Sequence, residues 1–308
     1  MKNALSMLLA AAVLFAPCAT RAAATAKAPV FTVPGIDEDM DLHGDLSRAD
    51  LVIYAAGNQW MVLPSLIGAF KRAHPEVRYV FYETLPPGLL AQQITSAGRL
   101  RVGDLLVDAR PDLLLAGKRR MAEERALGVV TDAVPYASNT LAIMVRRGNP
   151  KGVHSLRDLG RTDVRVAMPN PKTEGIAKQI EKALVKTGGT ALDREVMQTK
   201  VRAGTTILTR IHHRETPIWI LDGKADAGPV WISEALYQER IGSGLEAVRI
   251  AENENVSGTY EAAVASNPKH PAAAQAFVLF LLTAQAQAIY RAYGFSSPTS
   301  SKGGTNEP

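Results

Sequence analysis

The sequence predicts an α/β layered fold with mostly parallel strand pairing, and two observations support this. Short apolar runs bounded by turn residues alternate with segments of helical periodicity. Strands that alternate with helices are joined by crossovers, which place the strands parallel. The chain has 308 residues, 46% hydrophobic and 21% charged, which is a globular composition sufficient for one large domain or two of ordinary size.

The N-terminal segment, residues 1–26, has the pattern of a secretory signal peptide. Lys2 provides the charged start, residues 4–16 form an apolar run too short to span a bilayer, and Ala22–Ala26 offers small residues for cleavage. We therefore expect an exported, periplasmic protein. Residues 27–48 are rich in Pro, Gly and Asp and are expected to form a partly ordered N-terminal extension.

The single cysteine, Cys18, lies inside this signal, so the mature chain is expected to contain no thiol. Pro17 disfavours lipid attachment at Cys18, because such sites need a small residue there.

The first part of the chain contains four predicted strands and two helices. The strands are expected at Leu51–Ala56, Arg78–Tyr82, Pro111–Gly117 and Ala137–Arg147. The helices are expected from Trp60 or Met61 to Phe70, and over Leu89–Ser96.

The remainder repeats the same order of strand, loop and helix. Strands are expected at Val164–Met168, Ala225–Trp231, Glu246–Ile250 and Tyr260–Ala265. Helices are expected at Leu156–Gly160, at Ile176–Lys186 with an end at Gly188-Gly189, from an N-cap at Thr216 to Leu221, and at Ala272–Thr283 and Ala284–Tyr293.

Loops that follow the strands are the expected ligand sites, because ligands bind outside the carboxyl ends of strands in such sheets. These loops are Gly57-Asn58-Gln59, Thr84–Gly88 with Pro87, and Pro169–Gly175 with Thr173 and Glu174. The Glu174 charge would oppose a bound anion, so we expect its side chain to point away or only its backbone to be used. The alternative is that these loops only form tight or stiff turns.

A second candidate is the segment His212-His213-Arg214, which precedes the helix start at Thr216. Exposed N–H groups and the positive end of the helix dipole favour an anion there, and a guanidinium group is a forked donor for oxyanions. An ordinary loop with two histidines at its rim explains the same residues, and this alternative stays open.

The two histidines also raise the possibility of a metal site with Glu215 or Asp226. Neighbours on an extended segment point in opposite directions, so only one histidine is expected to face a given site. The sequence therefore predicts no metal site.

Two functional classes are disfavoured. Basic residues occur as short pairs such as Arg119-Arg120 and not as clusters with interleaved aromatics, so no nucleic-acid partner is expected. Neither G-x-S-x-G nor H-E-x-x-H occurs, so the chain is expected to be no enzyme and to use no cofactor.

Over roughly residues 50–295 the chain resembles the type II periplasmic solute-binding proteins of ABC importers, most closely the molybdate-binding group. The segments that carry the resemblance are YAAGNQ, PPGLLAQQI, PDLLLAG, NTLAIMV, PKTEGIAKQI, ADAGPVW and IYRAYGF. The resemblance implies two α/β lobes joined by two crossing strands, with residues 49–138 and 258–308 in one lobe and 139–257 in the other.

The resemblance also implies a site between the lobes. Its positions fall on Asn58 with its neighbours Gly57 and Gln59, Pro87-Gly88, Glu174-Gly175, His213-Arg214 and Trp231. Asn58 stands where the family has serine, and Trp231 where it has tyrosine.

The implied function is to clamp a small anion, with a molybdate- or tungstate-like oxyanion as the expected solute, and to deliver it as a monomer to the membrane permease. An organic anion, or a sensor or accessory role without an importer, remains an alternative; a hydrolase or a metal-binding protein is less favoured.

Overall fold

The structure is a computed structural model that describes residues 41–102, 105–210 and 212–298. The predicted signal peptide and most of the predicted N-terminal extension lie outside these residues.

The strands are short except for two. They are β1 (Leu42–His43), β2 (Leu51–Ala55), β3 (Val80–Glu83), β4 (Arg99–Val102), β5 (Leu105–Asp108), β6 (Leu113–Gly117), β7 (Val134–Arg146), β8 (Val166–Met168), β9 (Thr206–Leu208), β10 (Ala227–Trp231), β11 (Leu245–Arg249) and β12 (Ser257–Val264).

The α-helices are α1 (Leu63–Ala73), α2 (Pro87–Thr95), α3 (Lys118–Ala126), α4 (Gly175–Arg194), α5 (Lys200–Arg202), α6 (Glu215–Leu221), α7 (Ile232–Arg240), α8 (Pro271–Leu281) and α9 (Ala284–Ala292). Short 3-10 helices lie at Leu46–Arg48, Gly57–Gln59 and Leu156–Gly160, and a π-helical stretch at Glu195–Thr199.

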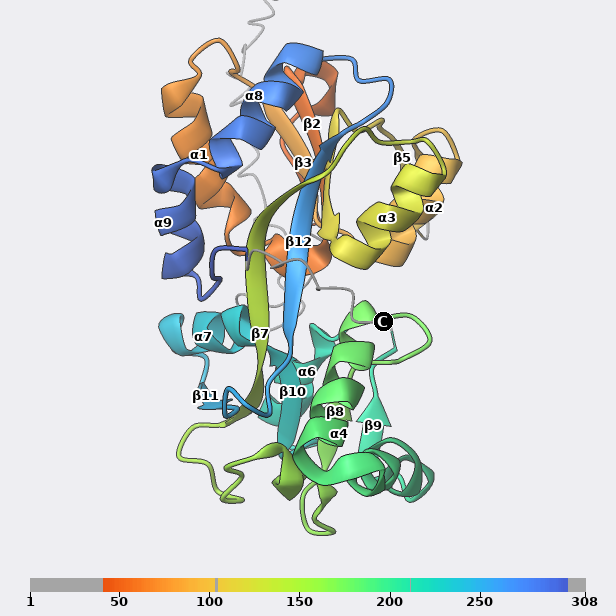
Figure 1. Ribbon diagram of the computed structural model, residues 1–308, viewed down its shortest axis with the longest axis vertical. Coiled ribbons are helices and arrows are strands. Elements are labelled where there is room, and N and C mark those ends of the chain that lie inside the picture. Colours follow the sequence, from red (N-terminus) through yellow and green to blue (C-terminus); the bar gives the residue numbers. More distant parts are fainter. Residues whose placement is uncertain (1–40, 103–104, 211, 299–308) are drawn as a thin grey trace, which may run out of the picture. The chain divides into compact units, whose positions relative to one another are not determined.

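One sheet runs through the described residues in the order β1-β3-β2-β6-β12-β7-β10-β8-β9, and β11 pairs with β7. Strands β3, β2 and β6 are parallel to one another, as are β10, β8 and β9. The long strands β7 and β12 pair antiparallel between these two sets and run from one half of the molecule into the other (Figure 1). The predicted fold class, two α/β lobes joined by two crossing strands, is confirmed.

Each half has its own hydrophobic cores, on both faces of its part of the sheet. In the first half, which we call lobe 1, helices α1, α8 and α9 cover one face and α2 and α3 the other (Figure 1). In the second half, lobe 2, α4 covers one face and α6 and α7 the other. The buried apolar residues of the lobe 1 cores lie within residues 49–137 and 260–295. Those of the lobe 2 cores lie within residues 141–250. We propose that the boundaries between the lobes lie at residues 138/139 and 257/258, as expected from the sequence.

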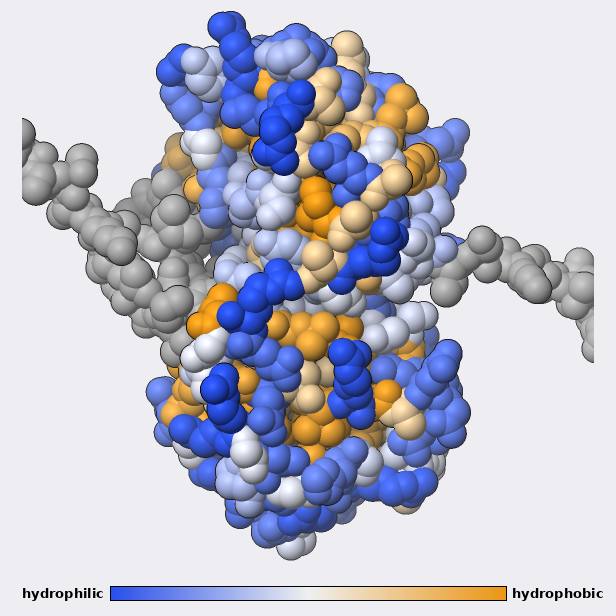
Figure 2. Space-filling view, turned by 90° about the vertical axis from the view of Figure 1, so that its left-hand side faces the viewer, coloured by the Kyte–Doolittle hydropathy of each residue, from blue (hydrophilic) through white to orange (hydrophobic). Residues whose placement is uncertain are grey.

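The surface is mainly hydrophilic on the side shown in Figure 2, with apolar groups scattered over it. Within the described part of the chain, no single helix is long and apolar enough to cross a membrane, and only the pair α8 and α9, bent by 65°, meets those criteria jointly.

Three expectations about helices need correction. Thr216 is not an N-cap, because α6 already begins at Glu215 and its N-cap is Arg214. The turn before the helix is closed by the hydrogen bonds Glu215 N–His212 O (3.0 Å) and Thr216 N–His213 O (2.9 Å). Helix α1 begins at Leu63 and not at Trp60 or Met61, because residues 60–62 form a turn and Pro64 lies in the first turn of the helix. At Gly188-Gly189 the first helical segment of α4 does end, but a second segment follows the kink and continues to Arg194.

Candidate functional site

The turn before α6 carries His212, His213 and Arg214 into the interior, where each is at most 5% exposed. The two imidazole rings lie side by side, with centroids 4.0 Å apart. The expectation that only one histidine faces a given site is wrong, because the segment is a turn and not an extended strand.

Arg214 reaches from lobe 2 to lobe 1. Its Nη1 donates to Oδ1 of Asp41 (3.0 Å), and its Nη2 donates to the carbonyl oxygen of Thr84 (2.8 Å). Its Nε donates to Nδ1 of His212 (3.3 Å), which fixes the direction of the guanidinium plane. The Asp41 carboxylate also accepts a hydrogen bond from Oγ1 of Thr84 (2.8 Å). A buried guanidinium group of one lobe therefore holds a carboxylate from the other.

Gly57, at the carboxyl end of β2, packs directly on this arrangement. A β-carbon at this position would lie 2.8 Å from Nη2 of Arg214, 3.0 Å from the Thr84 carbonyl oxygen and 3.2 Å from Nε2 of His212. Only glycine leaves room for the guanidinium group here. The structure thus brings together Gly57 and Arg214, two of the predicted site residues.

Asn58 and Gln59, the next two predicted residues, are buried and turn toward the crossing strands. The amide of Asn58 donates to the hydroxyl of Tyr260 on β12. Oε1 of Gln59 accepts from the hydroxyls of Tyr136 (2.7 Å) and Tyr290 (3.3 Å). These hydrogen bonds fix the segment that follows β2 against the crossing strands.

Trp231 at the end of β10 is 8% exposed and meets Tyr260 edge to face, with ring centroids 6.1 Å apart. Its ring also lies against Gly258, where a β-carbon would come within 2.6 Å of the indole. The predicted aromatic residue therefore packs at the crossing strands.

Glu174, immediately before α4, directs its carboxylate inward, contrary to the expectation that it would point away. Its Oε2 accepts from the backbone N–H (2.5 Å) and Nδ1 (2.6 Å) of His213. Its Oε1 accepts from the backbone N–H of Asn170 (3.1 Å) and from the hydroxyl of Thr209. The reason is that the folded chain places His213, 39 positions further on, beside this carboxylate as a positive partner.

His213 lies between two carboxylates, because its Nε2 is 3.0 Å from Oε1 of Glu234 on α7. Burial by itself would lower the pKa of His213, but the charges of Glu234 and Glu174 and the hydrogen bonds to them raise it to about 10. Burial would raise the pKa of Glu174, but the hydrogen bonds and charge of His213 keep it below its ordinary value. Burial, with the charges of His213 and Arg214, holds the pKa of His212 well below its ordinary value. His213 is thus an imidazolium and His212 a neutral imidazole at neutral pH.

The other predicted residues lie around this cluster. Thr173 and Gly175 are exposed at the start of α4, and Gly175 faces Arg119 of lobe 1, whose Nη2 would be 3.8 Å from a β-carbon there. Pro87 begins α2 and lines a separate small cavity, while Gly88 is exposed with open space around it. Thr216 is fully buried inside the first turn of α6.

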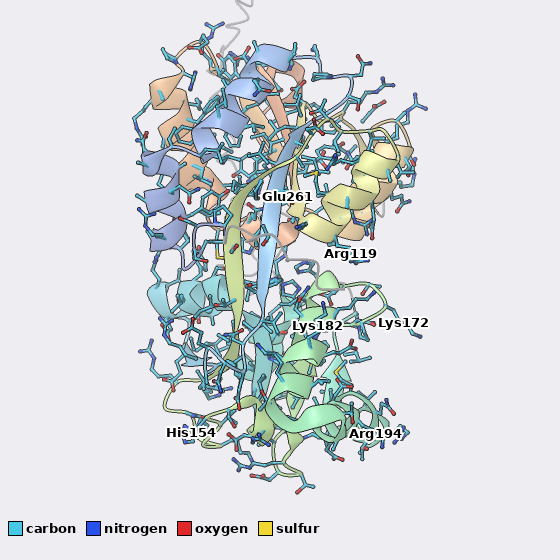
Figure 3. The ribbon with its side chains drawn as sticks, viewed as in Figure 1. Arg119, His154, Lys172, Lys182, Arg194 and Glu261 are labelled. Atoms are coloured by element: carbon cyan, nitrogen blue, oxygen red, sulfur yellow. The ribbon has the colours of Figure 1, made fainter. Side chains whose placement is uncertain are left out.

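Basic residues occupy the rim between the lobes. Figure 3 places Arg119 on the side of lobe 1 that faces lobe 2, near the loop that carries Lys172. Both are exposed. Such a rim raises the local concentration of anions.

A small cavity of about 10 Å³ adjoins His213 and Arg214. It has room for about one water molecule, and Trp60, Tyr237 and Glu234 also line it. The described side chains therefore fill most of the space between the lobes, and a solute has to replace one of them.

Sequence reasoning missed Asp41, Glu234 and Tyr260. Asp41 falls in the stretch read as an N-terminal extension, and no local pattern ties it to Arg214. Glu234 carried a possible signal, because a glutamate three residues into a helix is a common partner of the cap position; here it accepts from the backbone N–H of Trp231 (3.2 Å).

Two α/β lobes that share two crossing strands, with buried polar side chains between them, are the architecture of a protein that encloses a small solute. A family model described as bacterial extracellular solute-binding protein matches residues 51–296. The chain belongs to this family, which is non-enzymatic and serves ABC transport, as the sequence predicted.

Individual relatives agree with this assignment. The chain is 25% identical over 252 residues to the molybdate-binding protein ModA of Mycobacterium tuberculosis, covering 80% of this chain and 85% of that protein. It is 28% identical over 174 residues to a sulfate-binding protein of Synechococcus elongatus; that match covers 54% of this chain and about half, 48%, of the relative. Among solved structures, the fold is similar to that of the sulfate-binding protein SubI of Mycobacterium tuberculosis, with a TM-score of 0.65 at 22% identity over 81% of this chain and 86% of SubI.

Proposed function

We propose that this protein binds a small oxyanion, of the molybdate, tungstate or sulfate type, between its lobes and delivers it to the permease of an ABC importer. The observation that carries the proposal is the contact of Arg214 with the Asp41 carboxylate. A buried guanidinium group that already holds a carboxylate oxygen from the opposite lobe offers the donors that an oxyanion needs.

The solute takes the place of the Asp41 carboxylate. There it meets Nη1 of Arg214 and the Thr84 hydroxyl, the same two donors that now serve Asp41. The basic rim, with Arg119 and Lys172, assists capture.

Binding shifts the protein toward the closed arrangement, because only there do donors from both lobes reach the same solute. The crossing strands at Asn139–Val145 and Gly258–Ala265 act as the hinge. The protein works as a periplasmic monomer, with a small anion and the permease as partners and no nucleic acid.

A small organic anion is the second candidate. Trp60 and Tyr237 meet edge to face, with centroids 5.0 Å apart, and line the cavity beside Arg214. Such aromatic walls suit a solute with an apolar part next to its charged group.

A thermal-shift screen of the purified protein, followed by calorimetry, tests the proposal. Molybdate, tungstate, sulfate, phosphate and small carboxylates are compared, since a ligand of the folded state raises the melting temperature. Arg214→Lys keeps the charge but loses the forked donor, and we expect it to weaken binding at least tenfold. Arg210→Ala is the matched control, because Arg210 is an exposed arginine of the same loop.

If no oxyanion stabilises the protein while an organic anion does, the second candidate replaces the first. If Arg214→Lys binds as tightly as the unmodified protein, Arg214 is not the anion donor.

A further inference from the structure

Beside the guanidinium group lies a cluster of metal-ligating side chains that the proposed function does not use. Glu174, His212 and His213 are all buried, and one potential ligand atom from each lies within 4.8 Å of the others. They come from two places distant in the chain, the residue before α4 and the turn before α6.

We propose that Glu174, His212 and His213 bind a divalent transition-metal ion of the zinc type. Two imidazoles and one carboxylate are a ligand set that such ions accept, and the set leaves a coordination position for water or a solute oxygen. The site uses different side chains from the proposed anion site, but it adjoins that site, because Nε of Arg214 donates to Nδ1 of His212 (3.3 Å).

The side chains around the cluster already hold its ligands in place. Oε1 of Glu174 is fixed by Asn170 and Thr209, so Oε2 is the oxygen directed at Nδ1 of His213, 2.6 Å away. On the opposite side of the ring, Nε2 of His213 faces Glu234 at 3.0 Å. An N–H donated to a carboxylate while the other nitrogen binds metal is the arrangement that orients metal-binding histidines in proteins.

The metal replaces a proton. In the metal-free protein Nδ1 of His213 lies 2.6 Å from Oε2 of Glu174, a hydrogen-bond distance, so one proton lies between these two atoms. When a divalent ion binds Nδ1, that proton leaves to solvent, while the Nε2–H remains bonded to Glu234. The Nδ1 lone pair of His212 accepts from Nε of Arg214 in the metal-free protein (3.3 Å), so Arg214 has to release this nitrogen before a metal ion can bind it.

The charges of the neighbouring side chains favour a cation. Asp41, Glu174 and Glu234 carry three formal negative charges, and His213 and Arg214 carry two positive ones, which leaves −1. Exchange of one proton for a divalent ion brings this sum to zero. The charge of Arg214 opposes the metal, and Asp41 balances that charge at 3.0 Å.

The test is a titration of the full chain with Co²⁺ in a chloride buffer without oxyanions, followed by visible absorption. We expect one equivalent to give the intense bands of a nitrogen- and oxygen-bound site, and equimolar Zn²⁺ to remove them. Calorimetry in buffers of different ionisation enthalpy should show about one proton released per metal ion near pH 7, since the ion displaces the proton that lies between His213 and Glu174.

Three variants complete the test. Glu174→Gln and His212→Asn should each weaken Co²⁺ binding at least tenfold. His154→Asn, which changes an exposed histidine at the far end of lobe 2 (Figure 3), should leave it unchanged.

Glu174→Gln removes a buried charge and can impair folding. His212→Asn then decides, since the asparagine oxygen can still accept from Arg214. Absence of Co²⁺ bands in the unmodified protein, binding that survives His212→Asn, or binding without proton release would each overturn the proposal. None of these outcomes depends on whether an anion binds.

Discussion

Replacement of Asp41 by asparagine should tighten anion binding, because it removes the charge that competes for Arg214. In the structure, the Asp41 carboxylate accepts from Nη1 of Arg214 at 3.0 Å and from the Thr84 hydroxyl at 2.8 Å. An incoming oxyanion has to displace the Asp41 carboxylate, so the free energy of the contact between Asp41 and Arg214 lowers the net free energy of anion binding. The substituted asparagine would keep the shape of the side chain and lose its charge.

The size of the effect follows from the contact that is lost. A hydrogen bond to a charged group contributes about 1.5–3 kcal/mol, and 1.4 kcal/mol is about tenfold in affinity. Asp41→Asn should therefore tighten the binding of the anion identified in the screen by about 10- to 100-fold. Without an anion the same variant should melt at a lower temperature, since Arg214 loses a carboxylate partner in a buried setting.

The assay is calorimetric titration of the unmodified protein, Asp41→Asn and Asp45→Asn. Asp45 belongs to the same segment, but it is exposed and its carboxylate accepts hydrogen bonds from Ser47, so its replacement should leave anion binding unchanged. Equal or weaker anion binding by Asp41→Asn, with Asp45→Asn unchanged, would refute the idea that the carboxylate occupies the anion position.

Three further predictions concern stability, each measured by urea unfolding. Burial, only partly offset by its hydrogen bond from a glutamine, raises the pKa of Glu83 from 4.5 to about 7, so its carboxyl group keeps its proton in the folded protein up to about pH 7. Stability should fall by about 3 kcal/mol as the pH rises through that range, and Glu83→Gln should abolish the fall. The pKa of His213 is about 10 in the folded protein and 6.5 in the unfolded chain, so its protonation stabilises the fold by at most about 5 kcal/mol. This stabilisation is complete below pH 6.5 and is lost as the pH rises to 10. An unfolding free energy that does not change between pH 6.5 and 10 would contradict the ion pairs of His213. Gly228→Ala should cost about 1–3 kcal/mol or more, because its β-carbon would lie 2.3 Å from the Thr216 methyl group and 2.9 Å from the Ala167 carbonyl oxygen; unchanged stability would mean that α6 moves freely.

The alternation of strands and helices could be predicted because its signals are local. Apolar runs at Leu51–Ala55 and Leu113–Gly117 are strands in the structure, and Pro217 does lie in the first turn of a helix. Helix α3 was missed, because Lys118–Ala126 is dominated by charged residues and has little apolar periodicity. The β4–β5 hairpin was missed as well, because each of its strands, Arg99–Val102 and Leu105–Asp108, has only four residues, too few for a clear alternating pattern.

The composition of the site was harder to predict because its partners are far apart in sequence. Arg214 and Asp41 are separated by 173 positions, and His213 and Glu174 by 39. A charge rule applied to Glu174 alone suggested that its carboxylate would avoid an anion site. The rule failed because the His213 counter-charge becomes apparent only when the chain is folded.

Strand β12 lies between β6 and β7 in the sheet, although both precede it in the chain. It fills the middle of a sheet whose other lobe 1 strands have been synthesised long before. Helices α8 and α9, which cover one face of that lobe, also come last. Lobe 1 is therefore synthesised first but can be completed only last. Until β12 has been synthesised, the edge of β6 that pairs with it lacks its partner strand.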